Sequence, residues 1–119
     1  MPELPLSGDA LLAAVSESMV ALHERYQNRK PVTVKTQLMG DEMLACVMHG
    51  VYTEVEKTMI ETQRQSIVQE TRSAFLNAME HRLIAEVENL SGRSVTDFMT
   101  NSHVGPDLEI KLFVLAPAS

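Results

Sequence analysis

Residues 53–90, TEVEKTMIETQRQSIVQETRSAFLNAMEHRLIAEVENL, decide the fold. The stretch contains neither glycine nor proline, so it predicts a helical segment. Thr53 and Glu56 have the spacing of a capping box at its start, and Ser91-Gly92 supplies a stop at its end. A straight helix over this range would span roughly 55 Å, far more than the diameter of a domain of this size. The segment must therefore break or extend beyond its own domain.

The hydrophobic pattern changes phase inside this segment. Apolar residues of the second part recur on one helical face, whereas Val55 and Met59 fall on roughly the opposite side. Residues 61–66 between the two sets are all polar. This favours a short helix over residues 53–61, a polar turn, and a long helix over residues 66–90. The alternative is one continuous helix whose first turns pack on a partner subunit.

The flanking segments predict one more helix and four strands. Residues 7–27 carry an apolar stripe in three- and four-residue steps, and Pro31 prevents the helix from continuing. Alternating apolar residues and turn signals then predict strands over residues 32–39, 43–49, 94–102 and 108–115. The second of these is apolar on both sides, which indicates an interior strand.

This order predicts an α+β fold of helix, hairpin, long helix and hairpin (αββαββ). We expect the two hairpins to form a four-stranded antiparallel sheet with the helices packed on one face. Residues 7–115 make a single domain, because the chain is long enough for one core and too short for two. Residues 1–6 are expected to be a flexible tail, and residues 116–119 form a second tail.

Composition and charge exclude several classes of protein. A hydrophobic content of 45% excludes a disordered chain. The net charge of -6 argues against binding nucleic acid or anionic lipid, because both need clustered Lys and Arg. No stretch approaches the ~20 apolar residues of a membrane span, and no basic, apolar leader opens the sequence. The single Cys46 suits a reducing compartment. We therefore expect a cytoplasmic protein without direct membrane insertion.

No catalytic, metal or cofactor motif is recognisable. The four His residues are scattered without metal-ligand spacing, so no metal site is expected. No glycine-rich loop follows a strand, so no nucleotide cradle and no cofactor are expected. The carboxylates of the helical segment, Glu56 among them, are interpreted as solvated faces. These observations predict that the protein is not an enzyme.

A polar cluster surrounds the second hairpin and consists of Arg93, Asn101, His103 and Asp107. Ordinary turn chemistry accounts for such residues, since Asn and Asp side chains satisfy backbone groups. The functional alternative is a ligand-binding site for a small anion, which requires Arg93 and His103 to converge. Both interpretations are compatible with the sequence.

Four stretches together are similar to a known family. They are residues 30–34 (KPVTV), 47–56 (VMHGVYTEVE), 90–95 (LSGRSV) and 102–115, which begins SHVGPD and ends FVL. Their order and spacing resemble the small bacterial MpsC-like proteins over about residues 9–115. The resemblance implies association with a cation-translocating, membrane-potential-generating system that is linked to inorganic carbon (bicarbonate) uptake. It supplies no catalytic residue.

These observations favour a non-enzymatic accessory or regulatory protein that acts through protein contacts. A homodimer is expected, because two helical elements cover one face of the sheet and leave the other. The predicted interface consists of Val55, Met59, Ile60, Met39, Phe113 and Leu115. A membrane transporter subunit is the second expected partner, and it would hold the protein at the membrane periphery. The alternative function is a small-anion (bicarbonate-like) binding module built on the polar cluster.

Overall fold

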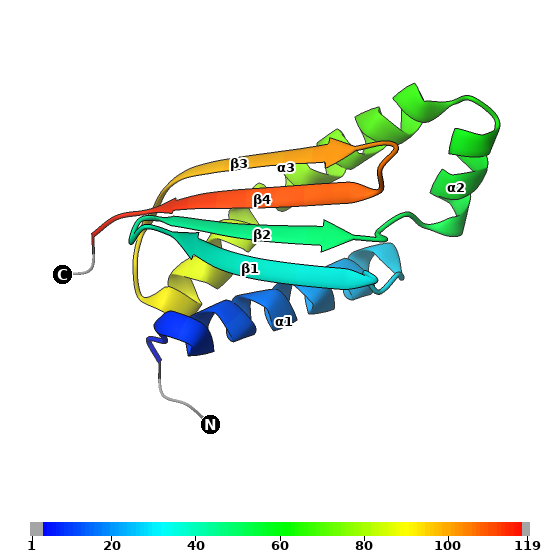
Figure 1. Ribbon diagram of the computed structural model, residues 1–119. Helices are drawn as coiled ribbons and strands as arrows, with labels where there is room; N and C mark the ends of the chain where they lie inside the picture. The colour runs from blue at the N-terminus through cyan, green and yellow to red at the C-terminus, as the bar shows by residue number, and fades with distance from the viewer. Residues whose placement is uncertain (1–3, 118–119) are drawn as a thin grey trace.

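The computed structural model describes residues 4–117 of the chain. Three helices and four strands follow one another along these residues, and every strand pair is antiparallel. Their bounds are α1 Gly8–Gln27, β1 Thr33–Met39, β2 Met43–His49, α2 Glu54–Glu61, α3 Gln65–Ser91, β3 Val95–His103 and β4 Leu108–Leu115. The predicted α+β class and the four-stranded antiparallel sheet are confirmed (Figure 1).

The two hairpins join through their second strands, which gives the strand order β1-β2-β4-β3. β2 and β4 pair from Met43 opposite Val114 to His49 opposite Leu108. The interior position predicted for residues 43–49 is therefore confirmed. β1 and β3 form the two edges, where polar side chains alternate with apolar ones and blunt further strand pairing.

The helical segment breaks at its polar run. α2 ends at Glu61, Gln63 adopts a left-handed conformation with φ of 63°, and α3 begins at Gln65. The Thr53 hydroxyl accepts from the Glu56 amide, and the Glu56 carboxylate accepts from the Thr53 amide, so the capping box is present. The broken arrangement is thus confirmed, and the continuous helix is wrong.

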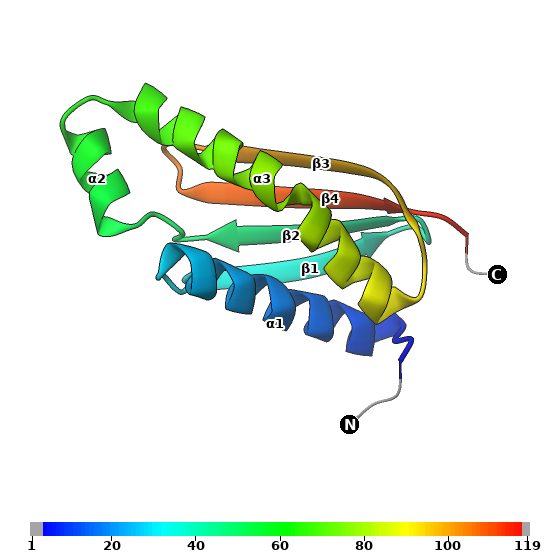
Figure 2. The ribbon, with the colours of Figure 1, turned by 180° about the vertical axis from the view of Figure 1, so that it is seen from behind.

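α1 and α3 lie on the same side of the sheet, as two opposite views show (Figures 1 and 2). The hydrophobic core lies between these two helices and the sheet, and it contains Leu11, Val15, Met19, Leu44, Cys46, Met48, Val51, Leu76, Met79, Leu83, Val87, Phe113 and Leu115. α2 stands beyond the ends of the strands, and none of its residues is buried. No described helix covers the other side of the sheet.

Packing extends into both of the predicted tails. The Leu6 amide donates to the Leu90 carbonyl (2.7 Å), and the Leu6 side chain packs against the core. At the other end, the Ala116 amide donates to the Ser94 carbonyl (2.8 Å). Tail residues 1–3 and 118–119 lie outside the described residues.

Candidate functional site

The residues predicted for an anion site do not converge. Arg93 precedes β3 and His103 ends it, and an extended strand of that length separates them by roughly 30 Å. Arg93 is already engaged, because its guanidinium donates to the carbonyls of Ala116 (2.8 Å) and Asp41 (2.7 Å). It therefore ties the first hairpin to the end of the chain, and the predicted pocket does not form.

Asp107 and His103 belong to a structural turn between β3 and β4. The two carboxylate oxygens of Asp107 accept from the amides of Val51 and Tyr52, each at 3.0 Å. The Tyr52 hydroxyl donates to the His103 carbonyl (2.9 Å), and the Gly105 amide donates to the same hydroxyl (2.9 Å). These contacts hold the turn against the loop that follows β2, which is the turn chemistry considered from the sequence.

Two of the six predicted interface residues are core residues. Phe113 and Leu115 are fully buried beneath the helices, and the Phe113 ring packs against Phe98 with centroids 5.0 Å apart. The interface prediction is wrong for these two. Both faces of β4 are apolar over its second half, so alternation alone could not tell which face the helices cover. Met39, in contrast, is 48% exposed at the outer edge of the sheet.

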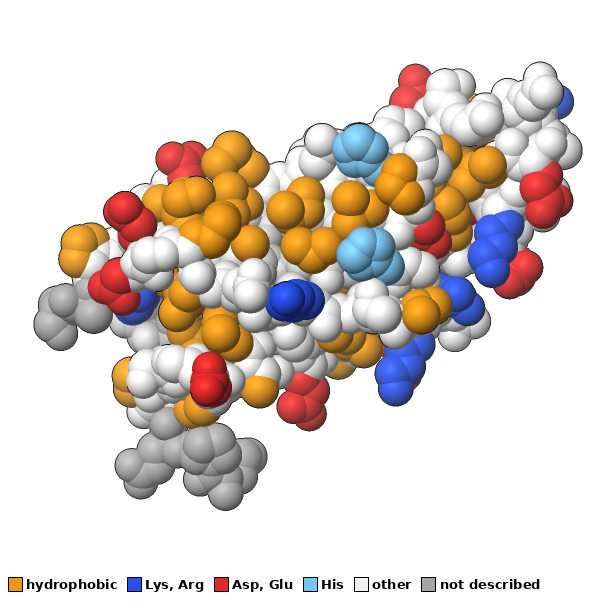
Figure 3. All heavy atoms as spheres, viewed as in Figure 1, with side chains coloured by type: hydrophobic (Ala, Val, Ile, Leu, Met, Phe, Trp, Pro, Cys, Tyr) orange, Lys and Arg blue, Asp and Glu red, His pale blue; other side chains and the backbone are white. Residues whose placement is uncertain are grey.

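The uncovered side of the sheet is the larger candidate surface, and we call it the open face. Along β2 and β4 it carries only apolar side chains until the last row, where His49 pairs with Leu108. Met99 of β3 is 55% exposed beside them. Figure 3, viewed from this side, shows hydrophobic side chains gathered over the strands. The apolar members are Met39, Met43, Ala45, Val47, Met99, Leu108, Ile110, Leu112 and Val114.

Polar residues frame the open face along its two edges. Lys35 lies on β1, while Asp97, Asn101 and His103 lie on β3. Asn101 and His103 thus come from the predicted ligand-binding set but occupy the rim of an apolar surface. An apolar centre with a polar rim is typical of protein-binding surfaces.

A second group of apolar side chains lies along α2 and the first turn of α3, and we call it the elbow. Val55 is 72% exposed and Ile67 is also exposed, while Met59 and Ile60 are partly buried. The elbow therefore contains the three helical residues of the predicted interface. Charged residues alternate with these side chains along α2, so the elbow is smaller and more highly charged than the open face.

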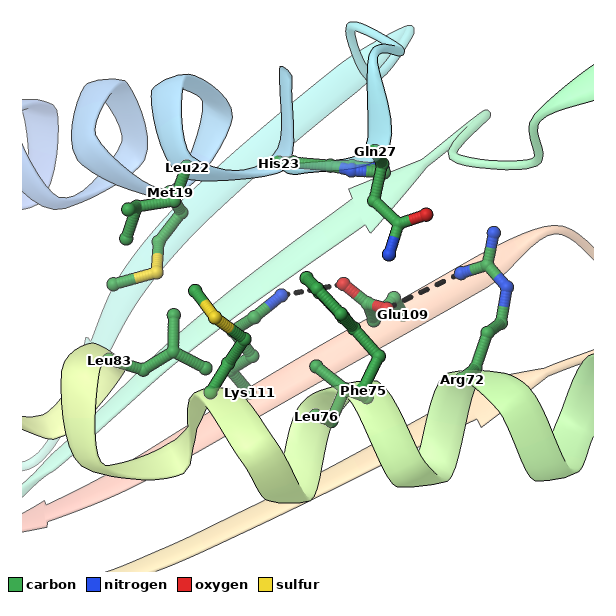
Figure 4. Close-up of a pocket in the computed structure, with 11 residues that line it drawn as sticks. Met19, Leu22, His23, Gln27, Arg72, Phe75, Leu76, Leu83, Glu109 and Lys111 are labelled. Carbon is green, nitrogen blue, oxygen red and sulfur yellow. Dashed lines mark hydrogen bonds and ion pairs between the residues drawn. The ribbon is translucent and has the colours of Figure 1, made fainter. Parts of the chain in front are cut away.

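A buried polar cluster lies on the covered side of the sheet, at the end of the core that faces α2. Glu109 and Lys111 project from β4, with Lys111 Nζ 2.6 Å from Glu109 Oε2. Arg72 of α3 reaches Glu109 Oε1 at 3.3 Å and Glu56 Oε1 at 2.9 Å. Its guanidinium also lies over the Tyr52 ring, 4.9 Å from the centroid. The cluster joins α2, α3 and the sheet, and two cations balance two carboxylates. Figure 4 shows the part made by Arg72, Glu109 and Lys111.

His23 of α1 completes the cluster. It is buried, and its Nε2 has no hydrogen-bond partner among residues 4–117. Burial lowers the pKa of His23, Glu109 opposes this, and Lys111 and Arg72 lower the pKa further. For Glu109 burial raises the pKa, but the two neighbouring cations outweigh burial, so the pKa is lowered. The site therefore holds a neutral imidazole beside an ionised carboxylate.

A cavity of about 20 Å³ adjoins this cluster, large enough for one water molecule. His23 and Gln27 reach toward it from α1, and Glu109 and Lys111 rise from the sheet (Figure 4). Arg72 of α3 also lines the cavity, and the remaining lining is apolar. Because Arg72, Lys111, Glu56 and Glu109 are paired with one another, the cluster is equipped to hold helices on the sheet. Within residues 4–117, no group of three or more His, Cys, Asp or Glu is placed to hold a metal ion.

This cluster was not predicted, although two signals in the sequence pointed to it. Arg72 occupies the apolar stripe of α3, four residues after Val68 and four before Leu76. Glu109 and Lys111 share a strand face with the buried Phe113. Charged residues at core positions of two facing elements indicate a buried ion pair. Glu56, interpreted as solvated, is mostly buried through its contact with Arg72.

Comparison with known proteins identifies the family. Within residues 4–117, no helix has the length and apolar character needed to cross a membrane. No curated protein and no solved structure matches the chain. A family model described as "Na+-translocating membrane potential-generating system (MpsC)" matches residues 9–117, which is nearly the whole chain. The chain therefore belongs to this MpsC family.

Proposed function

We propose that the chain is a non-enzymatic accessory or regulatory component of a Na+-translocating or inorganic-carbon (bicarbonate) uptake system, and that it acts through protein contacts. The observation that carries this proposal is the open face. Exposed apolar surface on a folded domain weakens solubility unless another molecule covers it, so a surface of this extent indicates a partner.

Two kinds of partner fit the two apolar surfaces. One is a second copy of the chain, which would make a homodimer. The other is a subunit of the membrane system, which would hold the protein at the cytoplasmic membrane periphery. Direct docking on anionic lipid is disfavoured by the net charge of -6. Contact with a membrane protein is therefore the favoured route to the membrane.

The polar groups of the core support a structural role over a catalytic one. Arg72 contacts Glu56 and Glu109, and Lys111 contacts Glu109, so each of these charges has an opposite charge as its partner. The small-anion module is not proposed, because Arg93 and His103 lie at opposite ends of β3.

Site-specific photo-crosslinking in the native cell tests the proposal. A benzophenone amino acid replaces Met99 on the open face or Val55 on the elbow, and the matched control replaces His81, an exposed residue of α3 away from both surfaces. We expect covalent adducts with this chain or a subunit of the ion-translocating system from Met99 or Val55. If both positions give no more adduct than His81, the proposal is wrong.

A further inference from the structure

We infer that the occupant of the open face is a second copy of this chain, packed sheet against sheet about a twofold axis that runs along the seam between β2 and β4. This inference rests on the proposed function, since it names the partner of one of its two surfaces. Three observations carry it: the charge of the face, the arrangement of its rows, and its area.

The open face has almost no net charge, although the chain as a whole carries -6. Among the outward positions of the four described strands, Asp97 is the acidic residue and Lys35 the basic one. Two copies of an acidic protein repel each other through most of their surfaces. The open face avoids this repulsion, and a self-complementary contact needs such a neutral centre.

The rows of the sheet select the symmetry axis. Across β2 and β4 the outward rows read Met43 with Val114, Ala45 with Leu112, and Val47 with Ile110, and the last row is His49 with Leu108. A twofold axis along the seam places β2 of one copy over β4 of the other, so that each apolar row meets an equivalent apolar row. An axis across the strands would instead place the first row of one copy on the histidine row of the other. Apolar matching therefore favours the axis along the seam.

The same symmetry sets β1 of one copy against β3 of the other, which places Met39 opposite Asp97 in one row and Lys35 opposite Asn101 in another. Lys35 of β1 and Asn101 of β3 belong to one row, at opposite edges of the sheet. Rotation about the seam places the β1 edge of one copy against the β3 edge of the other. Lys35 of one copy then faces Asn101 of the other, twice in each dimer. This pairing is specific to the proposed axis.

The area of the face suits a reversible dimer. Four strands of seven to nine residues cover about 26 Å by 19 Å, or about 500 Å² per copy. Two copies would bury about 1,000 Å², which is the lower limit for a specific interface. Self-association is thus expected to depend on concentration, and the elbow stays free for a different partner.

Light scattering of the full chain over a range of concentrations gives the first test. The protein should shift from 13.2 kDa toward twice this mass as its concentration rises. Leu112→Asp, in the centre of the face, should abolish the shift, because it buries two uncompensated carboxylates per dimer. Ile67→Asp, the same kind of change on the elbow, should leave the shift intact. Far-ultraviolet circular dichroism establishes that both variants are folded.

A charge exchange at the edges tests the axis itself, with variants that leave the apolar centre unchanged. Asn101→Lys places like charges opposite each other and should weaken the dimer about two- to fivefold. Lys35→Glu alone leaves a carboxylate opposite Asn101. Combining Lys35→Glu with Asn101→Lys should restore the affinity at least to that of the parent chain. Failure of the pair to recover any affinity would rule out the axis along the seam.

The results separate this inference from the proposed function. If the chain stays monomeric at hundreds of micromolar but still crosslinks from Met99 to a different protein, the inference that a second copy occupies the open face is wrong. The proposed function through protein contacts then stands. A chain that stays monomeric and gives no adduct from Met99 or Val55 overturns both.

Discussion

The two faces of the sheet differ in a way that reverses the usual expectation. The covered face, beneath α1 and α3, contains Glu109 and Lys111 among its buried side chains. The open face presents Ile110 and Leu112 from the same strand. Position in the fold, and not hydrophobicity alone, therefore determines burial. A charge is tolerated inside when a partner is fixed beside it, and an apolar side chain is tolerated outside when another surface can cover it.

The strongest test of this contrast compares two adjacent residues of β4. Phe113→Ala should lower the free energy of unfolding by about 3–5 kcal/mol, because it removes a fully buried ring and leaves a cavity. Leu112→Ala should cost only about 1 kcal/mol in dilute solution, since its side chain is partly exposed in one copy. Urea denaturation measures both. Equal losses for the two variants in dilute solution would contradict the assignment of faces.

The buried ion pairs provide the next test. Glu109→Gln should lower the free energy of unfolding by about 3 kcal/mol, because Lys111 loses its charged partner while buried. Glu80→Gln, on the exposed surface of α3, is the control and should change stability by less than about 0.5 kcal/mol.

Replacing the pair as a unit sharpens this test. In Glu109→Leu combined with Lys111→Leu, Arg72 keeps Glu56 as its partner, and no buried charge is left alone on β4. We expect this double variant to be more stable than Glu109→Gln. A double variant that is less stable would indicate that the ion pair itself stabilises the fold.

The pH dependence of stability comes third. His23 faces Glu109 and Lys111 of β4, Arg72 of α3 and Glu56 of α2, and its pKa is lowered in the folded chain. The unfolded chain then binds the proton more readily, so this contribution is fully present above about pH 6.5 and is lost as pH falls from there toward the folded pKa. The slope is at most about 1.4 kcal/mol per pH unit.

Urea denaturation between pH 5 and 8 checks this expectation. His23→Gln should make the free energy of unfolding less dependent on pH in that range. His81→Gln, on the exposed side of α3, should leave the dependence unchanged. The lowered pKa of Glu109 has its own window, since its contribution is lost below about pH 4.5. If the free energy of unfolding of His23→Gln still falls as steeply with decreasing pH as that of the parent chain, another group causes the pH dependence.

The smallest expected effect concerns α2. Glu56→Gln removes the ion pair with Arg72 and weakens the capping box, at a cost of about 1 kcal/mol. Because no residue of α2 belongs to the hydrophobic core, the effect should be local. Amide hydrogen exchange should accelerate in residues 54–61 and stay unchanged in β2 and β4. Glu54→Gln, whose side chain is 87% exposed, is the matched control.

Much of the fold could be predicted because local patterns specify it. The polar run at residues 61–66 locates the helix break, and the Thr53–Glu56 spacing locates the capping box. The choice of covered face could not be predicted, because β4 is apolar on both sides near Phe113. That choice depends on contacts with α1 and α3, which are distant in the sequence.

The site was less predictable than the fold for a related reason. Polarity near a turn suggested Arg93 and His103, but the ends of a strand are far apart however polar they are. The polar cluster that does form joins Glu56, Arg72 and Glu109, whose separation in sequence hides their proximity. An arginine within an apolar helical stripe was the available clue.

The central pairing of β2 with β4 has a consequence for synthesis of the chain on the ribosome. The first hairpin is complete at His49, but the strand that covers its inner edge begins only at Leu108. Until β4 is synthesised, β2 exposes unpaired backbone groups and apolar side chains. An edge of this kind readily pairs with a strand of another chain. We therefore expect neither half of the chain to fold alone, and the nascent protein to depend on rapid completion or on chaperone protection.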